Sequence, residues 1–137
     1  MDPEIVKAKL ESLIRCISRI EGRRPESPGA LAEDLDSQDI ITLNLERAVQ
    51  LCVDIGSHIL LDYDMPSPDS MAGVFKTLGK AGVIDTDLAN RMARAAGFRN
   101  IAVHQYEAID WDIVFSIVSY RLDDFRVFAT AVMAKLP

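Results

Sequence analysis

The chain has 137 residues, of which 49% are apolar and 26% charged, and a formal net charge of −6. This length predicts one domain with a sizeable core, and the composition excludes a disordered or disulfide-rich protein. No apolar run reaches the ~20 residues of a membrane span. The acidic start of the chain lacks the apolar stretch of a signal peptide, so we expect a cytoplasmic protein without a leader. Both cysteines lie in apolar helical patterns, which predicts reduced core thiols.

The negative charge is concentrated in one part of the chain. Residues 25–75 carry a net charge of −9, whereas residues 76–104 carry +3. Nucleic-acid binding depends mostly on phosphate neutralisation, so an acidic protein is not expected to bind nucleic acids indiscriminately. A local positive site within residues 76–104 remains compatible with this charge.

Apolar residues recur at helical spacing in the first half of the chain. One helix is predicted over residues 5–20, with Pro3 in its first turn and Gly22 after its end. A loop follows to about Ser37, with a short turn near Leu31. Ser37 is the predicted N-cap of a second helix that runs to the segment beginning at Met65. This helix is apolar on most of its circumference, which predicts a central position.

Three further helices are predicted in the second half. A short one covers residues 71–78, and Asp85 caps another that continues toward Val103. The last starts near Asp110 and runs without interruption through Val132. No segment shows the alternation of a strand. The sequence therefore predicts an all-α, up-and-down bundle of four main helices plus a short one, in a single domain over residues 1–137.

One short segment concentrates side chains suited to catalysis: Arg99, Asn100, His104 and Tyr106 lie within eight residues. Histidine is suited to acid–base catalysis near neutral pH, and arginine to binding phosphate. On a regular helix, Arg99 and His104 lie roughly 140° apart and ~7.5 Å along the axis. They converge only if the helix ends between or just after them, or if a second chain supplies the opposing pair.

The string from Arg99 to Tyr106 reads R-N-I-A-V-H-Q-Y and stands just before the last helix of a short all-α chain. It resembles the HEPN superfamily, and more closely the HepT toxins of HepT/MntA-type toxin–antitoxin pairs, whose motif is R-x-x-x-x-H-x-Y. The resemblance extends to residues 16–20, 43–47 and 54–59. It implies a homodimer of HEPN domains that uses neither metal nor cofactor.

The resemblance also implies roles for the motif residues. HEPN ribonucleases use the Arg and His of two facing subunits to cut RNA. By that analogy, His104 is the general base for a ribose 2′-OH, Arg99 holds the phosphate, and Asn100 orients the phosphate or the histidine. The implied products are a 2′,3′-cyclic phosphate and a 5′-OH, from either messenger or transfer RNA.

Tyr106 matches the tyrosine to which, in HepT-like toxins, a nucleotidyltransferase antitoxin of the MntA type attaches AMP. The resemblance thus implies that Tyr106 is an off switch. A bulky anion beside His104 and Arg99 would block RNA and compete for the cationic site.

Other polar residues suggest weaker candidates. Asp54 and His58 share a face of the second helix, and form either a surface contact or a support for the active site. Asn44 and Arg47 interrupt the same apolar helix and suit a dimer interface or RNA. Four arginines gather toward the end of the first helix, where the helix dipole favours cations: Arg15, Arg19, Arg23 and Arg24.

A second function from another class fits the same residues. The chain could be a non-catalytic helical module that binds a partner nucleotidyltransferase and helps hold its substrate. The two hypotheses differ on His104, which only the ribonuclease requires. A purely structural bundle gives no reason for Arg99, Asn100, His104 and Tyr106 to cluster.

Overall fold

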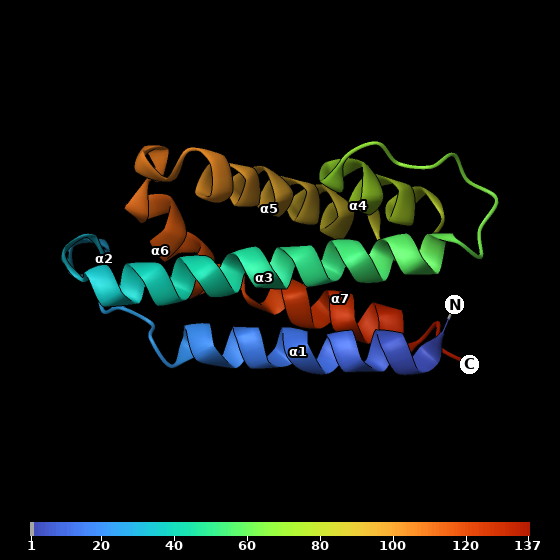
Figure 1. Ribbon diagram of the computed structural model, residues 1–137, viewed down its shortest axis with the longest axis horizontal. Helices are drawn as coiled ribbons and strands as arrows, with labels where there is room; N and C mark the ends of the chain where they lie inside the picture. Colours follow the sequence, from blue (N-terminus) through green and yellow to red (C-terminus); the bar gives the residue numbers. More distant parts are fainter. Residues whose placement is uncertain (1) are drawn as a thin grey trace.

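The computed structural model describes residues 2–137, and every regular element in this range is helical (Figure 1). This confirms the predicted all-α class. The α-helices of the described range are α1 (Pro3–Glu21), α2 (Pro28–Glu33), α3 (Leu35–Leu60), α4 (Met71–Lys80), α5 (Thr86–His104), α6 (Trp111–Tyr120) and α7 (Asp123–Met133), with a short 3-10 helix, η1 (Tyr106–Ala108). None of these helices is both long and apolar enough to cross a membrane.

Helix α1 follows the sequence prediction closely. The carboxylate of Asp2 accepts a hydrogen bond from the Glu4 backbone N–H, Pro3 occupies the first turn, and Gly22 caps the end. The buried side chains form one face at helical spacing: Val6, Leu10, Leu13, Cys16, Ile17 and Ile20. This face packs mainly against α3.

Helix α3 begins two residues before the predicted N-cap, which corrects the assignment of Ser37. Asp34 is the cap: its carboxylate accepts from the Ser37 backbone N–H at 3.1 Å and from the Ser37 hydroxyl at 2.7 Å. The loop before it contains α2. The buried Gln38 side chain donates to the carbonyl oxygens of Leu31 and Ala32, which fastens α2 to the start of α3.

The predicted last helix is two helices, which is the main correction to the sequence analysis. Helix α6 ends at Tyr120 and α7 begins at Asp123. Helix α6 packs against α2, whereas α7 packs against α1, α3 and α5, so the break redirects the chain. Acidic residues in the first turn of α7, Asp123 and Asp124, favour a helix N-terminus at this point.

Helix α3 is the centre of the fold, as its apolar circumference predicted. Figure 1 shows α5 and α4 on one side of α3, α1 and α7 on the other, and both termini at the same end. One narrow face of α3 stays accessible between α1 and α5. We call it the α3 stripe: Asp39, Leu43, Glu46, Arg47, Gln50 and Asp54. The polar residues that are candidates for catalysis border this stripe.

Candidate active site

Arg99 lies on α5 and reaches across to α3. Its guanidinium donates a hydrogen bond to Gln50 Oε1 at 3.3 Å and makes a long contact of 3.5 Å with Asn100 Oδ1. Its Nε is buried and has no hydrogen-bond partner within residues 2–137. The side chain is only partly exposed. Gln50 therefore holds one side of the Arg99 guanidinium. Other N–H donors of this permanently charged group remain available to an anion.

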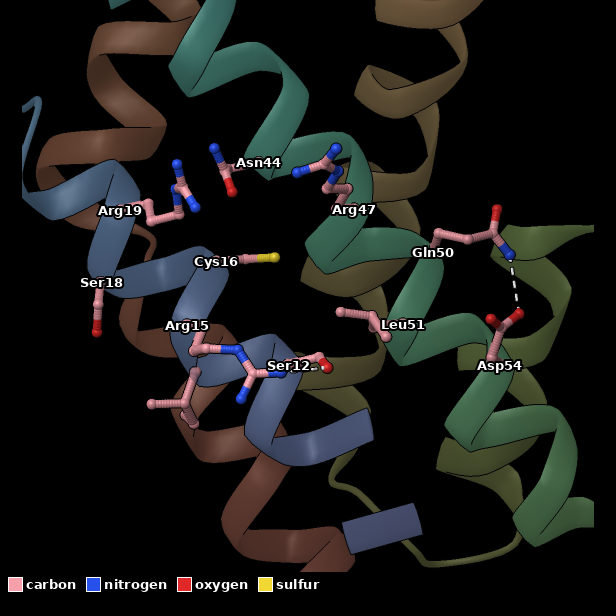
Figure 2. Close-up of a pocket in the computed structure, with 11 residues that line it drawn as sticks. Ser12, Arg15, Cys16, Ser18, Arg19, Asn44, Arg47, Gln50, Leu51 and Asp54 are labelled. Atoms are coloured by element: carbon pink, nitrogen blue, oxygen red, sulfur yellow. Dashed lines mark hydrogen bonds between the residues drawn. The ribbon is translucent and has the colours of Figure 1, made fainter. Parts of the chain in front are cut away.

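Gln50 is held in turn by Asp54. Its Nε2 donates to Asp54 Oδ1 at 2.9 Å, which Figure 2 shows as a dashed line. Because the amide nitrogen is used on Asp54, the amide oxygen turns toward Arg99. Asp54 also forms an ion pair with Lys9 Nζ at 3.5 Å. The predicted candidate Asp54 is thus linked to Arg99 through one side chain.

His104 is the last residue of α5 and is exposed. Its side chain forms no hydrogen bond or ion pair with any residue from 2 to 137. Helix α5 continues through both motif residues, so Arg99 and His104 point about 140° apart. A single chain therefore presents the two groups on different sides of the helix and does not join them.

Tyr106 lies just beyond His104, in η1, and is 41% exposed. Its hydroxyl donates to Asp39 Oδ1 at 3.1 Å, and its ring makes an edge contact with Trp111 at a centroid distance of 6.1 Å. Partial burial and the hydrogen bond to Asp39 raise the pKa of Tyr106. The contacts with Asp39 and with the half-buried Trp111 hold Tyr106, the residue predicted to be modified, in place.

His58 is held elsewhere. Its Nε2 accepts a hydrogen bond from the Asp2 backbone N–H at 3.0 Å, which ties α3 to the start of α1. The described contacts of Asp54 are with Gln50 and Lys9, so they do not include His58. Asn100 is exposed beside Arg99, and its only described side-chain contact is with that residue.

The site contains three residues to which the sequence analysis gave no role: Asp39, Glu46 and Gln50. Glu46 is close to Arg99 and Arg47. Burial raises its pKa, while both arginines act to lower it. The pattern that marks these residues is the spacing of polar positions in an otherwise apolar helix. Residues 39, 46, 50 and 54 follow helical periodicity and form the α3 stripe.

Within residues 2–137, no group of three or more His, Cys, Asp or Glu side chains is arranged to hold a metal ion. The polar groups at the α3–α5 junction are instead a cation, an imidazole, amides, carboxylates and a phenol. Groups of these types can bind an oxyanion and transfer a proton.

Known proteins resemble the chain over nearly its whole length. Over 132 residues it is 32% identical to the mRNA nuclease HepT of Shewanella oneidensis, covering 96% of this chain and 98% of that protein. It is 26% identical to the tRNA nuclease HepT of Aphanizomenon flos-aquae, covering 99% of this chain and 92% of that protein.

The fold leads to the same group of proteins. A solved structure of the tri-AMPylated Shewanella oneidensis HEPN toxin in complex with its MNT antitoxin superposes with a TM-score of 0.90 and 32% identity, covering 98% of this chain and 100% of the other. The family model described as "Ribonuclease HepT-like" matches residues 13–132. The chain therefore belongs to the family of HepT-like ribonucleases.

Proposed function

We propose that the chain is a metal-independent endoribonuclease toxin that acts as a homodimer and is inactivated by AMP attachment to Tyr106. Two similar proteins named as nucleases of mRNA and of tRNA support cleavage of RNA. The observation that carries the proposal is the partly buried Arg99, fixed by Gln50 and with an unpaired Nε, on the same helix as an exposed His104.

In the proposed reaction, His104 Nε2 or Nδ1 takes the proton of a ribose 2′-OH. The 2′ oxygen then forms a bond to the adjacent phosphorus as the bond from phosphorus to the 5′ oxygen breaks. The leaving oxygen takes up a proton from water. The products are a 2′,3′-cyclic phosphate and a 5′-OH. Charge that develops on the phosphate oxygens is stabilised by Arg99, which costs no reorganisation because Gln50 already holds it.

The orientation of α5 supports a site shared between two copies. Arg99 and His104 diverge in one chain, and His104 has no partner within residues 2–137. Two copies related by a two-fold axis would bring the arginine of each chain opposite the histidine of the other. Each phosphate would then meet an acid–base group and a cation from different subunits.

Inactivation by a nucleotidyltransferase partner is supported by a similar toxin and by the position of Tyr106 near His104. The similar Shewanella toxin is tri-AMPylated in complex with its MNT antitoxin. Here the Tyr106 oxygen would attack the α-phosphorus of a nucleoside triphosphate, losing its proton as pyrophosphate leaves. The attached AMP would add negative charge and bulk two residues from His104.

The test of catalysis is RNA cleavage by purified, unmodified protein in the presence of EDTA. We expect the wild type to cut RNA and leave 2′,3′-cyclic phosphate ends, and His104→Ala to lose this activity. His58→Ala is the matched control because His58, the other histidine of the sequence, accepts its hydrogen bond from the start of α1 instead. If protein verified free of AMP cuts no RNA, the proposal is wrong and a non-catalytic module is favoured.

The test of the switch is coexpression with the partner nucleotidyltransferase, followed by peptide mass spectrometry. We expect AMP on Tyr106 and none on Tyr120, although Tyr120 is 75% exposed. Tyr106→Phe should stay active in the presence of the partner. Modification at another residue, with Tyr106 unmodified, would contradict this part of the proposal.

A further inference from the structure

A second cationic site lies on the opposite side of the α3 stripe, between α3 and α1. It is an open groove of about 670 Å³. Figure 2 shows Arg15 and Arg19 on the α1 wall, Arg47 on the α3 wall, and Cys16 and Asn44 between them. Gln50 also lines this groove while it holds Arg99. The groove therefore adjoins the candidate active site through one shared residue.

The arginines of the groove form no ion pair with a described residue, although Glu46 lies close to Arg47. All three arginines are exposed, and the only described hydrogen bond among their side chains runs from Arg15 to the Ser12 hydroxyl at 2.9 Å. The side chains of Arg19 and Arg47 form no hydrogen bond or ion pair with residues 2–137. The single carboxylate of the lining, Asp54, is engaged by Gln50 and Lys9.

The three arginines also act on one common point. Burial raises the pKa of the Cys16 thiol at the floor of the groove, and the positive charges of Arg47, Arg15 and Arg19 each oppose that rise. The three arginines therefore surround one groove, in which successive phosphates of a chain could meet them.

Asn44 supplies an independent indication of a ligand. Its side chain is only 3% exposed, and its Nδ2 donates to the Ile40 carbonyl oxygen at 2.8 Å. Its Oδ1 is buried without a hydrogen-bond partner within residues 2–137. The described bond fixes which atom is the oxygen. An unpaired buried acceptor is costly, so a donor on a bound ligand would satisfy it.

We propose that this groove binds the ribose–phosphate backbone of single-stranded RNA next to the phosphate that is cut. Arg15, Arg19 and Arg47 would hold phosphates, and Asn44 Oδ1 would accept a hydrogen bond from a 2′-OH. The inference rests on the proposed ribonuclease function and extends it, because it assigns a binding site outside the R-x-x-x-x-H motif. Arginine recognises the phosphates of any nucleic acid, whereas an acceptor for the 2′-OH distinguishes RNA from DNA.

A second copy of the chain fits the groove less well. In a two-fold interface the same surface meets itself, so arginines near the axis would face arginines. The one acidic side chain of the lining is already paired. A polyanion supplies the missing negative charge, and a self-contact does not.

Binding is measured with His104→Ala protein, so that RNA stays intact, by fluorescence anisotropy of a short single-stranded oligoribonucleotide. We expect the double variant Arg19→Gln/Arg47→Gln to bind roughly tenfold or more weakly, with the salt slope reduced by about 0.7 for each phosphate that the protein no longer neutralises. The matched control is Arg94→Gln/Arg121→Gln, which removes the same charge from exposed arginines that line a separate pocket against α5 and α6.

Cleavage distinguishes the groove from the catalytic site. In an otherwise wild-type chain, the groove variant should lower cleavage of the oligonucleotide several-fold more than cleavage of a dinucleotide, which spans only one phosphate. If the wild-type protein cuts neither substrate, the proposed ribonuclease function is refuted. The binding measurement tests the groove independently of cleavage.

Three outcomes would overturn the inference. The first is unchanged affinity in the groove variant, and the second is an equal loss in the control. The third is a change from dimer to monomer in the groove variant, measured by light scattering, which would make the groove an interface between copies. The role of Asn44 is wrong if the His104→Ala protein binds DNA of the same sequence as tightly as RNA.

Discussion

Gln50 is the residue on which the geometry of the site depends. It accepts from Arg99 with its oxygen and donates to Asp54 with its nitrogen. Gln50→Met keeps the length of the side chain and removes both bonds. Hydrogen bonds to charged groups are worth about 1.5–3 kcal/mol, so we expect kcat for RNA cleavage to fall roughly 10- to 100-fold. The pH dependence should keep its shape, because Gln50 positions Arg99 and does not titrate.

The control for Gln50 is Lys9→Met. Lys9 touches the same assembly through Asp54, at 3.5 Å and with 35% of its side chain exposed. Exposed ion pairs contribute ~0–1 kcal/mol, and the bond from Gln50 to Asp54 survives this change. Activity should fall less than about fivefold. A larger loss in Lys9→Met than in Gln50→Met would show that Gln50 does not position Arg99.

Tyr106 carries a prediction about pH. Burial of the side chain raises the pKa of Tyr106. The carboxylate of Asp39 raises it further, because it accepts a hydrogen bond from the phenol and because its negative charge disfavours the phenolate. Asp39→Asn should therefore lower that pKa toward its ordinary value of about 10, though burial remains. The measurement is an absorbance titration in which the matching Tyr106→Phe protein is subtracted. Asp36→Asn, an exposed carboxylate one turn away, should leave the titration unchanged.

The two kinds of site residue differ in how far the sequence reveals them. Arg99, His104 and Tyr106 stand out because rare functional side chains cluster within eight positions. Asp39 and Gln50 are ordinary polar residues, and their role depends on which face of α3 is left open by α1 and α5. That choice is made by packing between distant segments, so a single sequence indicates it only through the spacing of polar residues.

At the scale of elements, the contact of α3 with α4 depends on one glycine. A Cβ placed on Gly56 would lie 2.8 Å from Leu78 Cδ1 and 2.8 Å from Val74 Cγ1, both in the buried core. Gly56→Ala should cost about 1–3 kcal/mol in packing, offset by up to ~1 kcal/mol of helix propensity. We expect a net loss of about 1–2 kcal/mol in urea unfolding.

Gly97 provides the matched comparison. It is an exposed helical glycine in α5, and nothing lies within 4 Å of its added Cβ. Gly97→Ala should therefore raise the free energy of unfolding by about 0.5–1 kcal/mol. Equal effects of the two substitutions would show that the approach of α3 to α4 is not tightly packed.

Element boundaries show where sequence reasoning fails. The buried positions Val114, Val118, Leu122, Phe125 and Val132 keep helical phase through the break between α6 and α7. No proline or glycine stands there, so periodicity predicts one helix. The break follows from where each half packs, α6 on α2 and α7 on α1. Where capping is local, as at Asp85, the prediction is confirmed, since its carboxylate accepts from the Leu88 N–H at 2.7 Å.

At the scale of the molecule, the two cationic sites lie on one face that is set in an acidic protein. Arg99 borders the α3 stripe from α5, and Arg15 and Arg19 border it from α1. A net charge of −6 repels polyanions from the rest of the surface. This arrangement directs RNA to the face that carries Arg99 and the arginine groove.

The divergence of Arg99 and His104 yields a test of the shared site. Arg99→Ala and His104→Ala should each be inactive alone. In a mixed dimer, one site lacks both groups and the other retains the arginine of one chain and the histidine of its partner. Random mixing makes half of the dimers mixed, each with one working site, so about a quarter of wild-type activity should return.

The mixing experiment requires denaturing and refolding the two variants together, so that subunits exchange, followed by assay of RNA cleavage. The double variant Arg99→Ala/His104→Ala mixed with wild type is the control. In that pairing each site of a mixed dimer lacks one group, so activity should return only from wild-type dimers, again about a quarter. A site built within one chain predicts different results for both mixtures. Mixing the single variants would then restore nothing, while the control would retain about half of the activity because each wild-type subunit works alone.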